Sequence, residues 1–325
     1  MPGRPNRSDL HVNGLLGNLA VNFILADHMY AADKIFPIVP VDKQSDNYAV
    51  YDKGDFLRDE AAERAPATES EGGDYDIDLT PYYICRNYAF HKDVDDDSRD
   101  NADKPIDPDK NAMQFSVQKI LIKRERMFIN NFVKAGVWTT QATGVSGEPG
   151  AGEVKKWSAS GSKPVKDVDT WVNAIEEQTG MRPNVLGLSP DVMSALKDNT
   201  DITGRIQYTQ KGIITTDILA ELFEVDKVVV LRGTYNTAAK GAATAMARMV
   251  SGKLLLAYAA PNPSTETPTA GAMFAWKGRF GNSRLGSRIS KFRMDELKAD
   301  RVEAELSFDP KCVAPDLAVY ASAMA

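Results

Sequence analysis

Apolar residues recur at helical spacing near the start of the chain. Leu16, Leu19 and Phe23 lie three and four positions apart within residues 14–31, which predicts one apolar stripe on a short helix. Pro37 and Pro40 close this segment. Such a stripe can pack on the chain's own core or dock onto another subunit, and the pattern leaves both interpretations open.

A second helical pattern predicts the longest helix of the chain. Asp107-Pro108 supplies an N-cap residue followed by proline in the first turn, and an apolar stripe continues from there to Gly136. The opposite face carries four bases, which we interpret as a solvated face: Lys119, Lys123, Arg124 and Arg126.

Residues 47–92 change to a period of two, which is typical of strands. The pattern includes Tyr48 and Val50 and later Tyr75, Ile77 and Leu79, with a polar excursion from Gly54 to Asp74 between them. Residues 52–79 contain ten acids and three bases, a net charge of -7. We therefore expect a long hairpin that leaves the body and is either functional or unable to fold alone.

The second half of the chain alternates between helix and strand patterns. Glycines and prolines in residues 140–165 predict a loop or a domain boundary, and the segment after it predicts a small α/β domain. In that domain Lys227 to Leu231 is predicted to be a fully buried strand. Strands dominate the last eighty residues, and Val302, Ala304, Leu306 and Phe308 alternate with polar residues along a half-buried sheet face.

Composition narrows the function classes. The 325 residues are 43% apolar and 26% charged with a net charge of -6, a balance that argues against a nucleic-acid reader. No apolar run is long enough for a membrane span, and the first residues lack the apolar core of a signal peptide, so we expect synthesis in the cytosol. Cys85 and Cys312 are far apart in sequence and suit a reducing compartment.

Catalytic and metal-binding patterns are not found. The three histidines, His11, His28 and His91, have no serine or cysteine partner in a recognisable motif. The acidic run from Asp93 to Ser98 lacks the glycine and glutamate of a calcium loop, and the glycines after Trp276 do not have phosphate-loop spacing. We therefore predict no catalytic residue, cofactor or metal site.

One basic strip remains, six bases with no acid among them: Lys277, Arg279, Arg284, Arg288, Lys291 and Arg293. These charges could contact phosphates, or they could meet the acidic excursion of a neighbouring subunit. We favour the second interpretation because the chain as a whole is acidic, whereas nucleic-acid-binding proteins show a basic balance.

The order of these elements resembles the major capsid protein of tailed bacteriophages, which has the Hong Kong 97-type fold. Three sets of residues carry the resemblance. Residues 51–65, YDKGDFLRDEAAERA, look like the extended loop of that family. Residues 184–192, 206–209 and 222–230 look like the family's axial domain, and residues 303–305 and 313–317 are similar to the family's closing strands. The resemblance implies an α+β fold in five parts: an N-terminal arm (1–45), the extended loop (46–92), a spine helix and linker (93–164), an axial domain (165–250) and returning strands (251–325).

The resemblance also implies a function. The chain would be a structural subunit that self-assembles as hexamers and pentamers into an icosahedral shell in the bacterial cytoplasm and encloses double-stranded DNA in the virion. A separate scaffolding protein, a portal and, in some members, a decoration protein would be its partners. The predicted interface residues are Leu16, Leu19 and Phe23 of the arm, the basic strip, and Asp55, Arg58, Asp59, Glu60, Glu63 and Arg64 of the loop.

One covalent feature of the family and two other functions remain alternatives to a simple capsid subunit. Lys53 lies in the loop, but no acid catalyst or acceptor for a lysine-to-asparagine cross-link is identifiable, so we expect none. An encapsulin-type shell would enclose cargo proteins in place of DNA. An α/β hydrolase or transferase on residues 165–235 would need a nucleophile and base that the sequence does not show.

Overall fold

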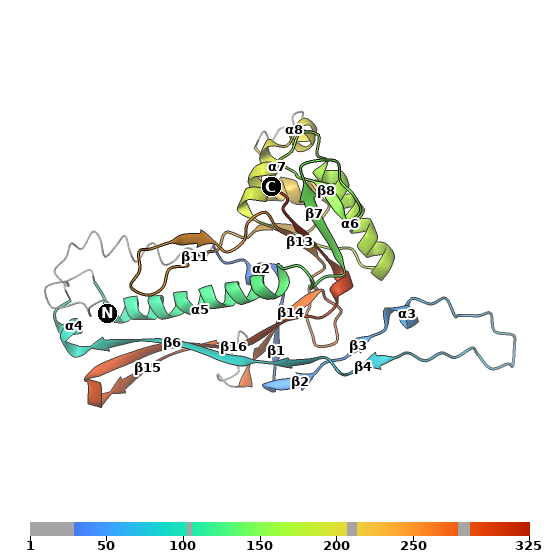
Figure 1. The fold of residues 1–325 in the computed structure, drawn as a ribbon. Coiled ribbons are helices and arrows are strands. Elements are labelled where there is room, and N and C mark those ends of the chain that lie inside the picture. The colour runs from blue at the N-terminus through green and yellow to red at the C-terminus, as the bar shows by residue number, and fades with distance from the viewer. Residues whose placement is uncertain (1–28, 103–105, 207–212, 279–286) are drawn as a thin grey trace.

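The computed structural model describes residues 29–102, 106–206, 213–278 and 287–325, and its fold is built on two large sheets, one long helix and one extended loop (Figure 1). Helices and strands are mixed along the chain, as the predicted α+β class requires. The axial sheet and its helices lie on one side of the long helix, and the peripheral sheet lies on the other (Figure 1).

The peripheral sheet is organised around one long strand, β16. Its strand order is β1-β14-β16-β15, and β6 also pairs with β16. The apolar side of the predicted alternation is confirmed, because Val302, Ala304, Leu306 and Phe308 are all buried. The prediction of a half-buried strand is wrong for the middle of β16, where Ser307 on the opposite face is also buried. Glu305 on the opposite face is covered as well, since the Arg288 guanidinium bonds its carboxylate at 2.7 Å. The strands are β1 (Ile38–Val41), β6 (Arg86–Asp95), β14 (Gly271–Trp276), β15 (Ser287–Met294) and β16 (Ala299–Cys312).

The spine helix α5 spans Pro108–Phe132 and packs on this sheet. It begins where the sequence predicts, because the Asp107 side chain accepts a hydrogen bond from the Lys110 backbone N–H at 3.1 Å. Ile120 packs on the alternating apolar residues of β16. Further along, Phe128 and Phe132 join the main core and contact Phe36 at ring-centroid distances of 6.0 and 4.6 Å. The helix therefore joins the peripheral sheet to the main core.

The axial sheet has the order β10-β9-β13-β17-β7-β8. Its strands are β7 (Thr140–Val145), β8 (Glu153–Lys155), β9 (Val185–Leu188), β10 (Lys227–Val230), β13 (Leu254–Ala257) and β17 (Ala318–Ser322). The helices α6 (Pro164–Thr179), α7 (Pro190–Asp198), α8 (Thr200–Ile206) and α9 (Thr216–Leu222) accompany it. Buried residues of α6, such as Trp171 and Ile175, share one core with the strands β9, β13 and β17.

Two predictions about this region are corrected by the structure. Residues 140–145 and 153–155 form two strands of the axial sheet, so within residues 140–155 only the part between them is a loop. Gly144 is needed in the first of these strands because a Cβ would lie 2.2 Å from the Ala323 carbonyl oxygen. The strand β10 is an edge strand and is only partly buried, with Lys227 exposed, because it pairs with β9 alone. A run of valines does not distinguish a central strand from an edge strand.

The remaining elements extend from these layers. A hairpin of β11 (Thr234–Asn236) and β12 (Met246–Arg248), which the sequence analysis did not predict, lies near α5 (Figure 1). Short elements complete the chain: α2 (Ala32–Ile35), α4 (Asp96–Asp100) and the 3-10 helices η3 (Asp295–Leu297) and η4 (Pro315–Leu317).

Candidate functional surfaces

The extended loop leaves the body as two thin arms (Figure 1). At its base β2 (Ser45–Asn47) pairs with β5 (Tyr82–Ile84), and farther out β3 (Val50–Tyr51) pairs with β4 (Ile77–Asp78). The single turn α3 (Lys53–Phe56) begins at Asp52, whose side chain accepts from the Gly54 N–H at 2.9 Å. The predicted hairpin is therefore present, but β6 from residue 86 onward belongs to the peripheral sheet and not to the loop.

Three of the predicted charged residues of the loop contact one another, and the other three are exposed without such contacts among the ion pairs of the described residues. Arg58 forms ion pairs with Asp55 at 3.0 Å and Glu60 at 2.9 Å, whereas Asp59, Glu63 and Arg64 are exposed. Between the two arms lies a polar hollow of about 610 Å³, lined by Arg58, Glu60, Ala61, Glu71, Gly72, Gly73 and Asp74. The tip of the loop therefore has no apolar core of its own.

Large apolar side chains are also exposed on the loop and at its base. Three rings, those of Tyr51, Phe56 and Tyr75, contact one another with centroids 5.2 to 6.0 Å apart. Phe56 is 59% exposed and Tyr75 is 51% exposed. Five more exposed side chains are Leu57, Ile77, Leu79, Tyr82 and Ile84. Apolar surface of this extent on a thin projection is typical of a protein-protein contact.

A polar contact fixes the loop near its base. The Lys53 ammonium group forms an ion pair with the Asp316 carboxylate, and the Thr139 hydroxyl donates to the same carboxylate at 2.5 Å. Hydrogen bonds from Lys53 and Thr139 lower the pKa of Asp316 below its usual value. Lys53 is therefore engaged within its own chain.

The described members of the basic strip are also engaged within the chain. Lys277 pairs with Asp42 at 3.0 Å and Arg288 with Glu305 at 2.7 Å. Arg279 and Arg284 lie outside the described residues. The strip was predicted to offer its charges to a neighbouring subunit, and the structure shows that four of its bases have carboxylate partners that the sequence analysis did not identify.

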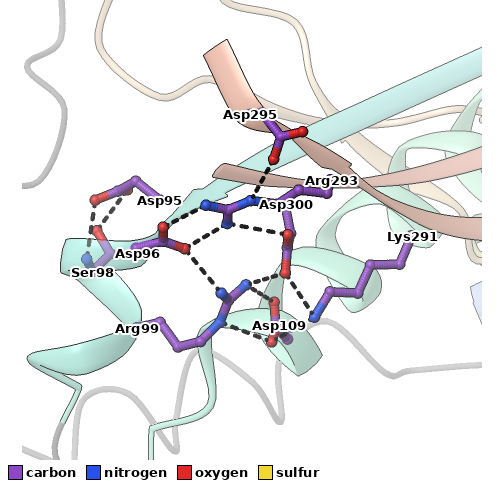
Figure 2. A network of polar contacts seen from close by, with 9 residues as sticks. All are labelled: Asp95, Asp96, Ser98, Arg99, Asp109, Lys291, Arg293, Asp295 and Asp300. Atoms are coloured by element: carbon purple, nitrogen blue, oxygen red, sulfur yellow. Dashed lines mark hydrogen bonds and ion pairs between the residues drawn. The ribbon is translucent and has the colours of Figure 1, made fainter. Parts of the chain in front are cut away.

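The last two bases of the strip belong to a network at one end of the spine helix (Figure 2). Lys291 contacts Asp109 at 2.9 Å and Asp300 at 3.2 Å, and Arg293 contacts Asp96 at 2.6 Å. Arg99 bridges the same three acids. The network joins α4, the start of α5 and the strands β15 and β16, which are distant in sequence.

Hydrogen bonds in this network favour the charged form of its acids. The pKa of Asp96 is lowered by its bond to Arg293, and that of Asp109 by its bond to Arg99. Desolvation opposes the shift at Asp300, but hydrogen bonds from Lys291 and Arg293 outweigh it and lower the pKa. The ion pairs of this network therefore hold α4 and the start of α5 against strands β15 and β16.

Sequence reasoning missed Glu125, which interrupts the bases on the spine helix. Its side chain is buried and accepts hydrogen bonds from the backbone N–H groups of Ala31 at 3.1 Å and Ala32 at 2.9 Å. Burial raises the pKa of Glu125, although these two N–H groups oppose the shift. The predicted arm residues Leu16, Leu19 and Phe23 lie outside the described residues, and this contact holds Ala31 and Ala32 farther along the same predicted arm.

Residues considered for chemistry have ordinary positions. His91 is exposed on β6, while His11 and His28 lie outside the described residues. Cys85 is buried with its thiol 3.5 Å from the Phe274 carbonyl oxygen, and both cysteines are unpaired thiols. Within the described ranges no group of three or more acids, histidines or cysteines is placed to hold a metal ion. In the same part of the chain no helix has the length and apolarity to cross a membrane.

These features define a class of protein. A spine helix on a long-stranded sheet, a second mixed sheet with flanking helices and a projecting loop make up the Hong Kong 97-type capsid fold, as predicted.

Comparison with known proteins supports the same class at the level of sequence. Residues 152–278 match the family model described as phage major capsid protein E. The chain is 27% identical over 229 residues to the major capsid protein of Burkholderia phage BcepMu, covering 69% of this chain and 70% of that protein. The predicted resemblance to phage major capsid proteins is confirmed by these matches.

Solved structures share the fold at lower identity. A phage-related protein from Bordetella bronchiseptica RB50 has a TM-score of 0.67 at 19% identity and covers 94% of this chain and 97% of its own. The capsid of cyanophage P-SCSP1u has a TM-score of 0.55 at 9% identity, covering 89% and 86%. The SrpI encapsulin of Synechococcus elongatus PCC 7942 has a TM-score of 0.54 at 11% identity, covering 89% and 85%. Together these structures confirm the predicted fold, and the sequence matches to phage major capsid proteins agree with the predicted structural role.

Proposed function

We propose that this chain assembles as hexamers and pentamers into an icosahedral shell around double-stranded DNA, and that it does so without enzymatic activity. Assembly would take place in the bacterial cytoplasm with a separate scaffolding protein and a portal, and in some particles a decoration protein would be added. The extended loop carries this proposal: its exposed rings and aliphatic side chains gain burial only against another molecule.

The loop is suited to contacts that are individually weak and collectively strong. Exposed ion pairs contribute about 0 to 1 kcal/mol each, so misplaced subunits can separate and correct their positions. Apolar burial adds roughly 25 cal/mol for each Å² removed from water, which gives the completed shell its strength. The loop combines both kinds of surface, with a net charge of -7 over residues 52–79 and a cluster of three rings beyond its base.

Docking of the acidic loop on the basic strip of a neighbour remains part of this proposal. The internal partners of Arg288, Lys291 and Arg293 reduce what those bases offer to another subunit. The arm residues Leu16, Leu19 and Phe23 are proposed as a further contact between subunits.

Replacement of residues 54–74 by a short Gly-Ser turn tests the role of the loop. We expect a folded, soluble subunit that unfolds at a temperature close to that of the wild type but no longer forms stable shells in electron micrographs. A second variant with Phe56 intact and only residues 59–71 shortened separates the charged tip from the ring cluster. Normal shells from the full replacement would show that the loop is not a contact between subunits.

An encapsulin-type shell is the second candidate, because an encapsulin shares the fold. The contents of purified particles distinguish the two functions. Nuclease-protected DNA supports a genome container, whereas a stoichiometric protein cargo supports an encapsulin.

A further inference from the structure

Positive charge is concentrated on the spine helix although the whole chain is acidic. The helix Pro108–Phe132 contains five bases and two acids, Asp109 and Glu125, while the chain as a whole has a net charge of -6. Glu125 is buried against the backbone N–H groups of Ala31 and Ala32, so it does not reach the helix surface. Asp109 lies at the start of the helix in ion pairs with Arg99 and Lys291, so the middle of the helix surface carries a net positive charge.

Three of these bases form one row. Lys119, Lys123 and Arg126 are exposed and lie at positions i, i+4 and i+7, which places them on the same side of the helix. The rise of about 1.5 Å per residue puts them roughly 6 and 4.5 Å apart along the axis. We call Lys119, Lys123 and Arg126 the spine row.

The three bases of the spine row lie over aromatic rings and, in the described part of the chain, not beside carboxylates. Lys119 lies 5.2 Å from the ring centre of Phe115, Lys123 lies 5.1 Å from that of Tyr88, and the Arg126 guanidinium lies 4.6 Å from that of Tyr235. Such contacts orient a cation without cancelling its charge. Among the residues that the structure describes, no carboxylate forms an ion pair with any of the three.

This arrangement contrasts with the basic strip. There, Arg288, Lys291 and Arg293 are each held by acids of the same chain. The spine row keeps its full charge, and a regular series of negative charges is the complementary partner. We propose that the spine row binds the phosphate backbone of duplex DNA, an inference that rests on the proposed function and assigns the surface that faces the packaged genome.

Duplex DNA fits the spine row better than the acidic loop of a second copy. The loop exposes rings and aliphatic side chains, such as Phe56, Leu57 and Tyr75, that need an apolar acceptor. Between Lys119 and Arg126, however, the exposed positions of the helix are charged. DNA presents one negative charge per ~1.7 Å of duplex axis, so a row of point charges can bind it in many registers and without sequence preference.

The test measures binding of a short labelled duplex to dissociated full-length subunits by fluorescence anisotropy across a salt series. The variant Lys119→Gln, Lys123→Gln, Arg126→Gln removes the row. A matched control, Lys163→Gln, Lys166→Gln, Lys197→Gln, removes three exposed charges from the axial domain and changes the net charge equally. Circular dichroism verifies that both variants fold, and a labelled peptide of residues 52–79 is measured in parallel.

We expect the spine variant alone to weaken DNA binding by roughly a hundredfold at about 0.1 M salt and to lower the slope of log K against log salt by about 2.7. Equal effects of both variants would overturn the proposal, as would unchanged DNA binding. Loss of loop-peptide binding with unchanged DNA binding would assign the row to a second copy instead. Shell formation by the wild-type chain is scored separately, so a failure of the proposed function is distinguishable from a failure of this inference.

Discussion

Glu125 is a charged residue between two arginines in sequence, but its side chain is buried in the fold. It lies among bases on a helix, yet it is buried and accepts hydrogen bonds from the backbone at the start of α2. The contact joins the spine helix to residues 31 and 32, which lie within the predicted arm (1–45). A carboxylate in this position satisfies two backbone donors that water cannot reach.

Substitutions at Glu125 should distinguish the contribution of its hydrogen bonds to stability from the contribution of its charge. Glu125→Leu leaves the N–H groups of Ala31 and Ala32 without an acceptor and should lower the free energy of unfolding by about 1–3 kcal/mol. Glu125→Gln keeps an acceptor and should lose less. Denaturant unfolding of both variants measures the difference, and equal losses would contradict the role of the hydrogen bonds.

The pH dependence of Glu125 has a defined sign. Its pKa is raised in the folded chain, so the folded state binds the proton more tightly than the unfolded state does. The wild type should therefore gain stability relative to Glu125→Gln as the pH falls from the raised pKa toward the usual value of about 4.3. A stability difference that does not change with pH would contradict this assignment.

The two thiols should be structural. Burial raises the pKa of both Cys85 and Cys312 to about 12, so neither is a reactive thiolate at neutral pH. The double variant Cys85→Ala, Cys312→Ala should still assemble, with a stability loss of roughly 1 kcal/mol per removed buried group. Light scattering checks the assembly of the variant. Non-reducing electrophoresis of wild-type particles checks for covalent links, and a ladder of disulfide-linked subunits would contradict a purely structural role of the thiols.

At the scale of elements, the exposed rings of the loop should serve assembly and not folding. Phe56→Ser with Tyr75→Ser should change the free energy of unfolding by no more than about 0.5 kcal/mol, because both side chains are largely exposed. The same variant should form fewer shells in light scattering. Unfolding of the subunit itself would show that the rings stabilise the loop within its own chain.

The stability that the ion-pair network between α4, α5, β15 and β16 contributes should decrease in acid. Asp96, Asp109 and Asp300 have lowered pKa values, so their stabilisation is present above the usual value near pH 4 and is lost as pH falls through the lower folded values. Asp300→Asn should lower the Tm at neutral pH, and the gap to the wild type should narrow in acid. A gap that stays constant across the pH series would contradict the network's contribution.

Local patterns predicted elements well and long-range contacts poorly. The start of α5 at Asp107-Pro108 and the alternation along β16 follow from caps and periodicity, which depend on neighbours in sequence. The partners of Lys291 and Arg293 come from residues 96, 109 and 300, which only the fold brings together. The edge position of β10 and the burial of Glu125 depend on packing in the same way.

At the scale of the whole molecule, the charges are segregated. The loop is acidic, whereas the spine helix is basic, within a chain of net charge -6. Charge contacts at the rim of an interface are screened over roughly 8 Å at physiological ionic strength. Raised salt should therefore weaken assembled particles, as light scattering across a salt series would show, and particles indifferent to salt would indicate that apolar contacts alone hold them.

The body and the loop have different tasks in this account. One apolar core joins the axial sheet, α6 and the end of the spine helix, so the subunit can fold by itself. The loop lies outside that core and presents surface to other molecules. A folded subunit that becomes fully packed only in contact with its copies is what shell assembly requires.

Electron microscopy of the purified full-length protein tests the central claim most directly. The account predicts closed icosahedral particles built from this chain, which the variant lacking residues 54–74 fails to form. Dispersed small oligomers of the wild type, under conditions in which the subunit is folded, would contradict a shell-forming role.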